Sequence, residues 1–181
     1  MAPCAPVDRS ISRSADAAGR VLRSRMGEIV IRVNPPITST QLYGFYQRNG
    51  ICEAGYAEER AAVVLAHPSL IVAAFDGERL VAIARALTDG LAAVIMELSV
   101  EVELQGVTRL GNGSVIEADA AGIGRWIGRA LLDELAARRI DFVSLDVVEE
   151  FETRFYESLG FERNPGMTVY AIDRRPYVTS A

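Results

Sequence analysis

The segment Gly122–Leu132 reads GIGRWIGRALL, and the arrangement of the whole chain depends on it. Its apolar residues recur at the spacing of one helix face, which predicts an amphipathic helix. This stripe consists of Ile123, Trp126, Ile127, Ala130, Leu131 and Leu135. Strand-like runs lie on both sides of the helix. The helix is therefore a crossover, and its two flanking strands are expected to run parallel.

Three apolar runs precede this helix: LIVAAF (70–75), LVAIARAL (80–87) and LAAVIMELSVEV (91–102). Asp76-Gly77 and Asp89-Gly90 separate them, and Asp-Gly between apolar runs is a strong hairpin signal. We therefore expect three antiparallel strands.

The remaining elements follow from local patterns. Thr38 and Gln41 form a capping-box pattern that opens a helix, and Asn49-Gly50 ends it. The other expected elements are a strand at 28–34, a helix at 57–66, a strand at 142–148, a helix at 151–160 and a last strand at 167–172. The order is β, α, α, β, β, β, α, β, α, β.

Composition places the chain among ordinary globular proteins. Its 181 residues suit one domain, 50% are hydrophobic, and no apolar run reaches the length of a membrane span. Residues 1–25 lack periodicity and are expected to be a disordered tail, which leaves a single domain at 26–181. We expect a cytoplasmic protein.

The sequence offers few residues that could bind a metal ion, and its charge does not favour binding to nucleic acid. The chain has one histidine, His67, and two distant cysteines, Cys4 and Cys52, so neither a metal site nor a disulfide framework is expected. Without the tail, 14 basic residues face 22 acidic ones. This excess of acids argues against nucleic acid as a partner and suits a cationic small molecule.

The glycines of the opening segment permit two interpretations. Gly122, Gly124 and Gly128 could let the backbone curl around an anion at the positive end of the helix. Equally, Gly124 and Gly128 could serve only to pack the helix closely on the sheet. A dinucleotide fingerprint is nearly met, but its third glycine is one place late and the preceding strands are hairpins.

Three stretches in this order and spacing resemble the GNAT superfamily of acyl-CoA-dependent N-acetyltransferases. They are RLVAIARALTDGLAAVIMELSV (79–100), IGRALLDEL (127–135) and RFYESLGF (154–161). The resemblance implies a mixed α/β (α+β) fold: a mostly antiparallel sheet of six to seven strands, a central splayed parallel pair, and helices on both faces.

Between the central strand and the helix, the sequence departs from the family's Gln-Gly-x-Gly-x-Gly phrase. In the preferred alignment Val107–Gly124 is an insertion, which keeps Gln105-Gly106 and puts Trp126 where a glycine is expected. In the other alignment the loop starts at Asp119, whose acid would repel phosphate.

The resemblance also implies roles for individual residues. Tyr156 matches the tyrosine that protonates the leaving thiolate, and the alternative is a packed aromatic residue next to Phe155. A backbone amide of the central strand would polarise the acetyl carbonyl. The cofactor-binding residues so implied are Leu98, Ser99, Val100, Gln105, Gly106, Gly124, Arg125, Trp126, Ile127, Gly128, Arg129 and Ala130. Phe45 and Tyr46 could wall the acceptor pocket, and core packing explains them equally well.

Glu97 is the candidate general base, because an amine must lose a proton before it attacks a thioester. A solvent-facing Glu97 is the more favoured interpretation, since a bulge in this strand would change which face it occupies. Glu101 and Glu103 are weaker candidates.

The leading hypothesis is acetyl transfer from acetyl-CoA to a primary amine of a small molecule, without a metal, membrane or nucleic acid. The alternative is a catalytically inactive module of the same fold that binds acyl-CoA or a protein partner. A nucleotide-binding domain is third, and a homodimer is a weak expectation.

Overall fold

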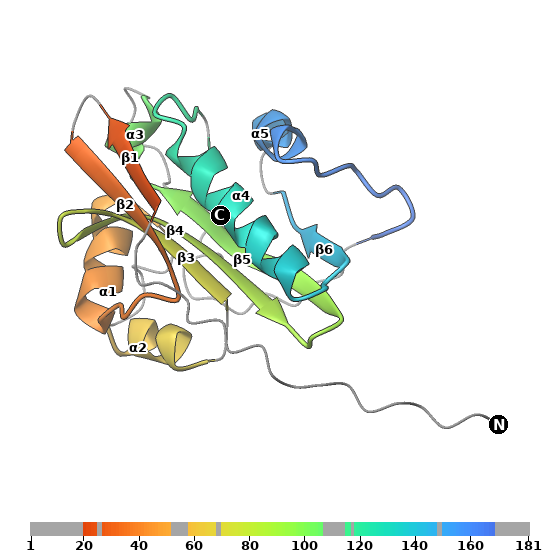
Figure 1. The fold of residues 1–181 in the computed structure, drawn as a ribbon, viewed down its shortest axis with the longest axis horizontal. Coiled ribbons are helices and arrows are strands. Elements are labelled where there is room, and N and C mark those ends of the chain that lie inside the picture. Colours follow the sequence, from red (N-terminus) through yellow and green to blue (C-terminus); the bar gives the residue numbers. More distant parts are fainter. Residues whose placement is uncertain are drawn as a thin grey trace, which may run out of the picture.

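A computed structural model describes the chain in seven ranges. These are 20–24, 27–51, 58–67, 70–106, 115–116, 118–147 and 150–168. Figure 1 shows a sheet with helices on both faces. The strands are β1 (Arg20–Ser24), β2 (Gly27–Val33), β3 (Leu70–Asp76), β4 (Arg79–Thr88), β5 (Ala92–Val100) and β6 (Phe142–Leu145). The helices are α1 (Ser39–Arg48), α2 (Glu58–Ala66), α3 (Val102–Gln105), α4 (Ile123–Ala137), a 3-10 turn at Glu150–Glu152, and α5 (Thr153–Ser158).

The described strands form one sheet in the order β1-β2-β3-β4-β5-β6. Among these described strands, neighbours from β1 to β5 are antiparallel, and only β5 and β6 are parallel. The crossover through α4 therefore has the effect expected from the sequence. The predicted mixed fold class is confirmed.

Two apolar cores cover the two faces of the sheet. Helices α1 and α2 pack on one face, over β3 and β4, around Leu42, Phe45 and Ile83. Helix α4 covers the other face through the predicted stripe, in which Ile123, Ile127 and Leu131 are almost fully buried. Trp126 of the same stripe is half-buried against this core.

The turn signals act as predicted. Thr38 accepts a bond from the Gln41 amide while the Gln41 side chain accepts one from the Thr38 amide, which is a complete capping box. Gly77 has a φ of 58° in the turn between β3 and β4. Asp89 accepts bonds from the amides of Leu91 and Ala92 at 2.8 and 2.9 Å, and these bonds lower its pKa, the Ala92 bond most.

The expected boundary of the N-terminal tail at residue 25 is wrong. Arg20–Ser24 forms β1 and pairs antiparallel with β2, from Arg20↔Ile31 to Ser24↔Gly27. Composition alone hid this strand, because short-range periodicity is weak in a strand of five residues. Residues 1–19 and both cysteines lie outside the described residues, as do residues 169–172 of the expected last strand.

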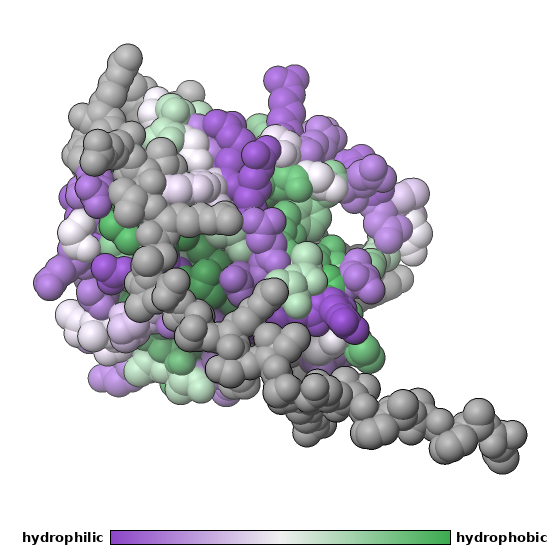
Figure 2. All heavy atoms as spheres, viewed as in Figure 1, coloured by the Kyte–Doolittle hydropathy of each residue, from purple (hydrophilic) through white to green (hydrophobic). Residues whose placement is uncertain are grey.

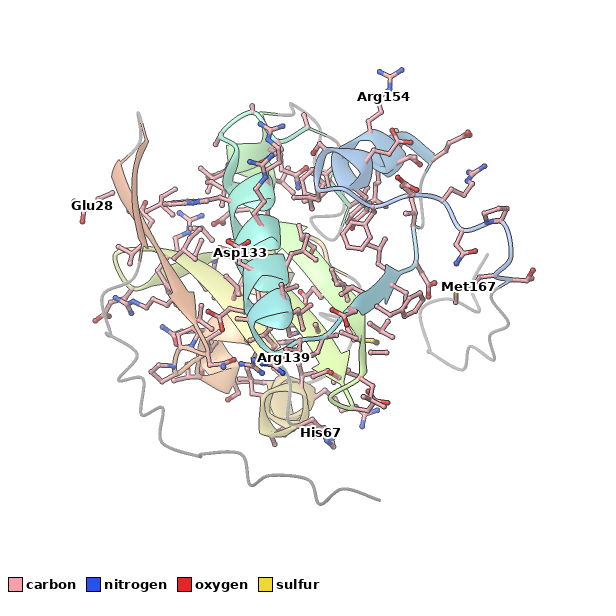
Figure 3. The ribbon with its side chains drawn as sticks, turned by 45° about the vertical axis from the view of Figure 1, so that its right-hand side comes forward. Glu28, His67, Asp133, Arg139, Arg154 and Met167 are labelled. Atoms are coloured by element: carbon pink, nitrogen blue, oxygen red, sulfur yellow. The ribbon has the colours of Figure 1, made fainter. Side chains whose placement is uncertain are left out.

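Hydrophilic side chains cover much of the face that α4 presents, and hydrophobic ones reach the surface between α4 and α5 (Figure 2). Figure 3 places Asp133 on the outer side of α4 and shows Arg154 pointing away from α5. His67 is exposed after the end of α2. Within the described ranges, no helix has the length and apolar character needed to span a membrane.

Candidate functional site

Strand β5 contains a bulge at Met96, immediately before the candidate base. Adjacent residues of β4, Arg85 and Ala86, pair with Glu97 and Ile95, so Met96 is the extra residue. Ile95 and Leu98 consequently face the α4 core, whereas Glu97 turns to the face of α1. The alternation of apolar residues could not reveal this change of face.

Strand β6 pairs with only the first part of β5 in the described residues. Their pairing runs from Ala92↔Phe142 to Ile95↔Leu145, and β5 then continues to Val100. Beyond Ile95 the described part of β6 supplies no partner, so the two parallel strands separate at their carboxyl ends. This is the end at which open α/β sheets bind ligands.

Glu97 does not face solvent, so that interpretation is wrong. Its side chain is 8% exposed, and the bulge explains why. Arg85 Nε donates to Glu97 Oε2 at 2.6 Å, Tyr46 Oη donates to the same oxygen at 2.9 Å, and Ser99 Oγ donates to Oε1 at 3.1 Å. The result is a buried carboxylate held in one orientation by three side chains.

Arg85 is the member of this cluster that sequence reasoning missed. Its side chain is 12% exposed and forms an ion pair with Glu97. A signal was present, since an arginine inside the apolar run LVAIARAL must find a partner if the strand is buried. The identity of the partner required the register of β4 against β5.

The weaker base candidates lie elsewhere. Glu101 is 4% exposed and bonds Arg48 Nε at 3.1 Å and also Arg79 Nη2. It therefore ties α1 to the start of β4 and the end of β5. Glu103 is 76% exposed on α3, with Arg79 at 3.8 Å.

Tyr156 lies on α5, on the opposite face of the sheet from Glu97. Its ring packs edge-on to Phe155 and Phe161, with centroids 5.1 and 6.2 Å away. Burial raises the pKa of the Tyr156 phenol above its ordinary value of 10.0, and the charge of Glu152 adds to the shift. Tyr156 also lines a pocket of about 670 Å³ between β6 and α5. It is both a packed aromatic residue and a phenol that stays protonated at neutral pH.

A carboxylate of the chain itself caps the N-terminus of α4. Asp119 Oδ1 accepts a bond from the Gly124 amide and Oδ2 one from the Arg125 amide, each at 2.9 Å. The Trp126 amide is already bonded to the Gly122 carbonyl at 3.1 Å. Helix α4 begins at Ile123, so Gly124 lies inside the helix and not in an insertion as the preferred alignment has it.

The resemblance described above implies that the diphosphate of CoA sits at this helix end. The residues present do not fit it there, because Asp119 occupies the amides that would bind it. The residues do fit the thioester end of the cofactor, because β5 beyond Ile95 is not paired with the described part of β6.

The remaining residues of the implied cofactor site are mostly packed. The Gln105 side chain is buried and donates to the carbonyl oxygens of Val100 and Val115, at 3.0 and 3.2 Å. A Cβ on Gly128 would lie 2.8 Å from Leu159 Cδ1, which supports the packing role of this glycine. Leu98, Ser99, Val100, Gly124, Ile127 and Ala130 are buried, whereas Gly106, Arg125 and Arg129 are exposed.

The two aromatic residues proposed for the acceptor pocket have different surroundings. Phe45 is fully buried in the core under α1 and α2. Tyr46 is equally buried, but its hydroxyl reaches Glu97. The structure therefore brings Tyr46, Glu97 and Ser99 together and leaves Phe45 in the core.

Several solved structures resemble this chain over most of its length. A GNAT-family acetyltransferase of Streptococcus pneumoniae is 23% identical, with a TM-score of 0.58 over 81% of this chain and 98% of that one. A probable acetyltransferase of Staphylococcus aureus is 18% identical, with a TM-score of 0.60 over 80% and 99%. A metagenomic aminoglycoside acetyltransferase solved with sisomicin is 15% identical, with a TM-score of 0.54 over 80% and 97%.

No family model and no curated protein sequence matches the chain. At these low identities the likeness speaks for the fold and not for the substrate. Taken with the bulged strand and the parted parallel pair, it shows that this chain has the fold of the GNAT-family acetyltransferases.

Proposed function

We propose that the chain transfers an acetyl group from a thioester to a primary amine of a small molecule. The observation that carries the proposal is a pair of side chains, one able to accept a proton and one able to donate it, on opposite faces of the sheet where β5 and β6 separate. Glu97 lies on the α1 face and Tyr156 on the α4 face. A thioester threaded between the two strands could reach both.

The acetyl donor would be acetyl-CoA, which supplies an activated acyl group. Glu97 would take a proton from the incoming amine, directly or through water, because a protonated amine has no lone pair with which to attack. A backbone amide in Leu98–Val100 would donate to the carbonyl oxygen as negative charge develops on it. Tyr156 would give its proton to the sulfur as the carbon–sulfur bond breaks.

The surroundings of both groups support these roles. Arg85, Tyr46 and Ser99 hold the Glu97 carboxylate in place, so little reorganisation is needed when a proton is transferred. The raised pKa of Tyr156 keeps its phenol protonated before transfer. An acidic chain, with a net charge of −5, also suits a cationic amine.

Turnover of Tyr156→Phe tests the proposal. Thiol release from millimolar acetyl-CoA is measured with a panel of small amines, for the wild type, Tyr156→Phe and the control Tyr43→Phe. We expect Tyr156→Phe to lower kcat by about 10²–10⁴-fold, the usual contribution of a general acid, with an unchanged melting temperature. Full activity in this variant would rule out Tyr156 as the acid.

A non-catalytic module of the same fold is the second candidate. The observation in its favour is Asp119, whose carboxylate fills the helix end that would hold the diphosphate. Thermal stabilisation by CoA without turnover of any amine in the panel would favour this candidate. Turnover in the wild type would exclude it.

A further inference from the structure

In the turn before α4, the Asp119 carboxylate occupies the place where an anion would bind to the helix N-terminus. Both oxygens of Asp119 are bonded to helix amides, and its side chain is only 2% exposed. Arg125 Nε lies 3.6 Å from Oδ2, and Arg125 Nη2 bonds the Asp119 carbonyl at 3.3 Å. Asp119 thus meets the same donors that a phosphate group would meet at a helix N-terminus.

Contacts with α3 hold this turn in place. The Ala120 amide donates to the Gln105 carbonyl at 3.2 Å, and the Gly122 amide donates to the Asp119 carbonyl at 2.9 Å. A Cβ built on Gly106 would lie only 2.6 Å from the Cβ of Ala120, so the Ala120 side chain packs directly on the Gly106 backbone. Asp119 is therefore held in place through its own carbonyl and through the contacts of the next residue, Ala120.

A diphosphate and Asp119 cannot share this helix end. The amides of Gly124 and Arg125 each have one proton to donate, and both are used. A second anion would also lie against a buried carboxylate, where like charges repel strongly. Asp119 must leave before a diphosphate can bind there.

We propose that Asp119 is a built-in competitor for the diphosphate position of the acyl donor and gives this chain a low affinity for CoA. The inference rests on the donor site of the proposed function, but it concerns binding alone. It predicts that the wild type gains little from the diphosphate of CoA. It also predicts that removal of the charge at residue 119 increases CoA affinity.

The test measures CoA binding by isothermal titration calorimetry for the wild type, Asp119→Asn and Asp89→Asn. Asp89 is a matched control, because its carboxylate also accepts two backbone amides but lies in the β4–β5 turn. We expect Asp119→Asn to bind CoA at least tenfold more tightly than the wild type, and Asp89→Asn to bind it as the wild type does. Equal or weaker binding by Asp119→Asn overturns the proposal, as does an equal gain in Asp89→Asn.

A second measurement needs no variant, in case Asp119→Asn fails to fold. The wild type is titrated with CoA and with pantetheine, which lacks the diphosphate together with the 3′-phosphoadenosine attached through it. Affinities within about threefold of each other support the proposal, whereas CoA binding more than tenfold tighter overturns it. Turnover distinguishes the two proposals: a gain in binding without turnover contradicts only the proposed function, and turnover without a gain contradicts only the role of Asp119.

Discussion

Tyr156 shows how burial alters the chemistry of a single residue. Its pKa is raised in the folded chain, chiefly by burial and also by the charge of Glu152, so the native state binds the phenolic proton more tightly than the unfolded state does. The associated stability is fully present below the unfolded pKa of about 10 and is lost as the pH rises toward the folded value. The phenol is thus a proton donor throughout the neutral range.

Alkaline unfolding tests this shift. We expect the free energy of unfolding of the wild type to fall more steeply above pH 10 than that of Tyr156→Phe, which has no phenol to ionise at this position. Urea denaturation between pH 8 and 11 measures the two curves, and Tyr43→Phe controls for loss of a phenol elsewhere. Parallel curves for the wild type and Tyr156→Phe would show that burial does not perturb this residue.

Helix α4 shows how close packing limits the size of the side chains that one helix can carry. Gly128 lies against Leu159 and Leu98, where a Cβ would approach their methyl groups to 2.8 and 3.3 Å. Among the residues that the structure describes, Gly44 in the middle of α1 has only the end of the Arg48 side chain nearby, at 3.5 Å. The two glycines occupy similar helical positions in different surroundings.

The same substitution at both positions should therefore have opposite effects. Gly44→Ala should stabilise the chain by about 0.5–1 kcal/mol, because alanine is the better helix former. Gly128→Ala should destabilise it by about 1 kcal/mol, because overpacking outweighs that gain. Urea denaturation compares them, and equal stabilisation at both sites would mean that α4 does not pack closely on Leu159.

At the scale of the whole molecule, β1 extends the sheet into the segment that sequence analysis assigned to the N-terminal tail. It pairs with β2 along the edge opposite the β5–β6 pair. Without β1, the backbone of β2 would be an unpaired edge, and such edges invite association between chains.

A truncation tests the contribution of β1. A chain that begins at Met26 should unfold at a lower urea concentration than one that begins at Arg20, and it should elute as a larger species in size-exclusion chromatography. Both effects follow from the exposed edge of β2. Identical unfolding midpoints and elution volumes would show that the pairing of Arg20–Ser24 contributes nothing to the fold.

Local patterns in the sequence determined the order of the helices and strands from β2 to α5, apart from the short helix α3 and the 3-10 turn. The capping box at Thr38, the Asp-Gly turns and the apolar stripe of α4 each depend on residues a few positions apart, and all three formed as predicted. The parallel pair then followed from the crossover. Interactions of this range can be read from one sequence because the backbone conformation they favour is local.

Only the tertiary structure decided how the candidate site is composed. The bulge at Met96 turns Glu97 toward Tyr46 and Arg85, and the return of the chain to α4 places Asp119 on the helix amides. Glu97 and Arg85 are twelve residues apart, and Glu97 and Tyr46 fifty-one. Such contacts depend on strand register and on the docking of distant segments, and a one-residue bulge is enough to reverse the face on which a side chain lies.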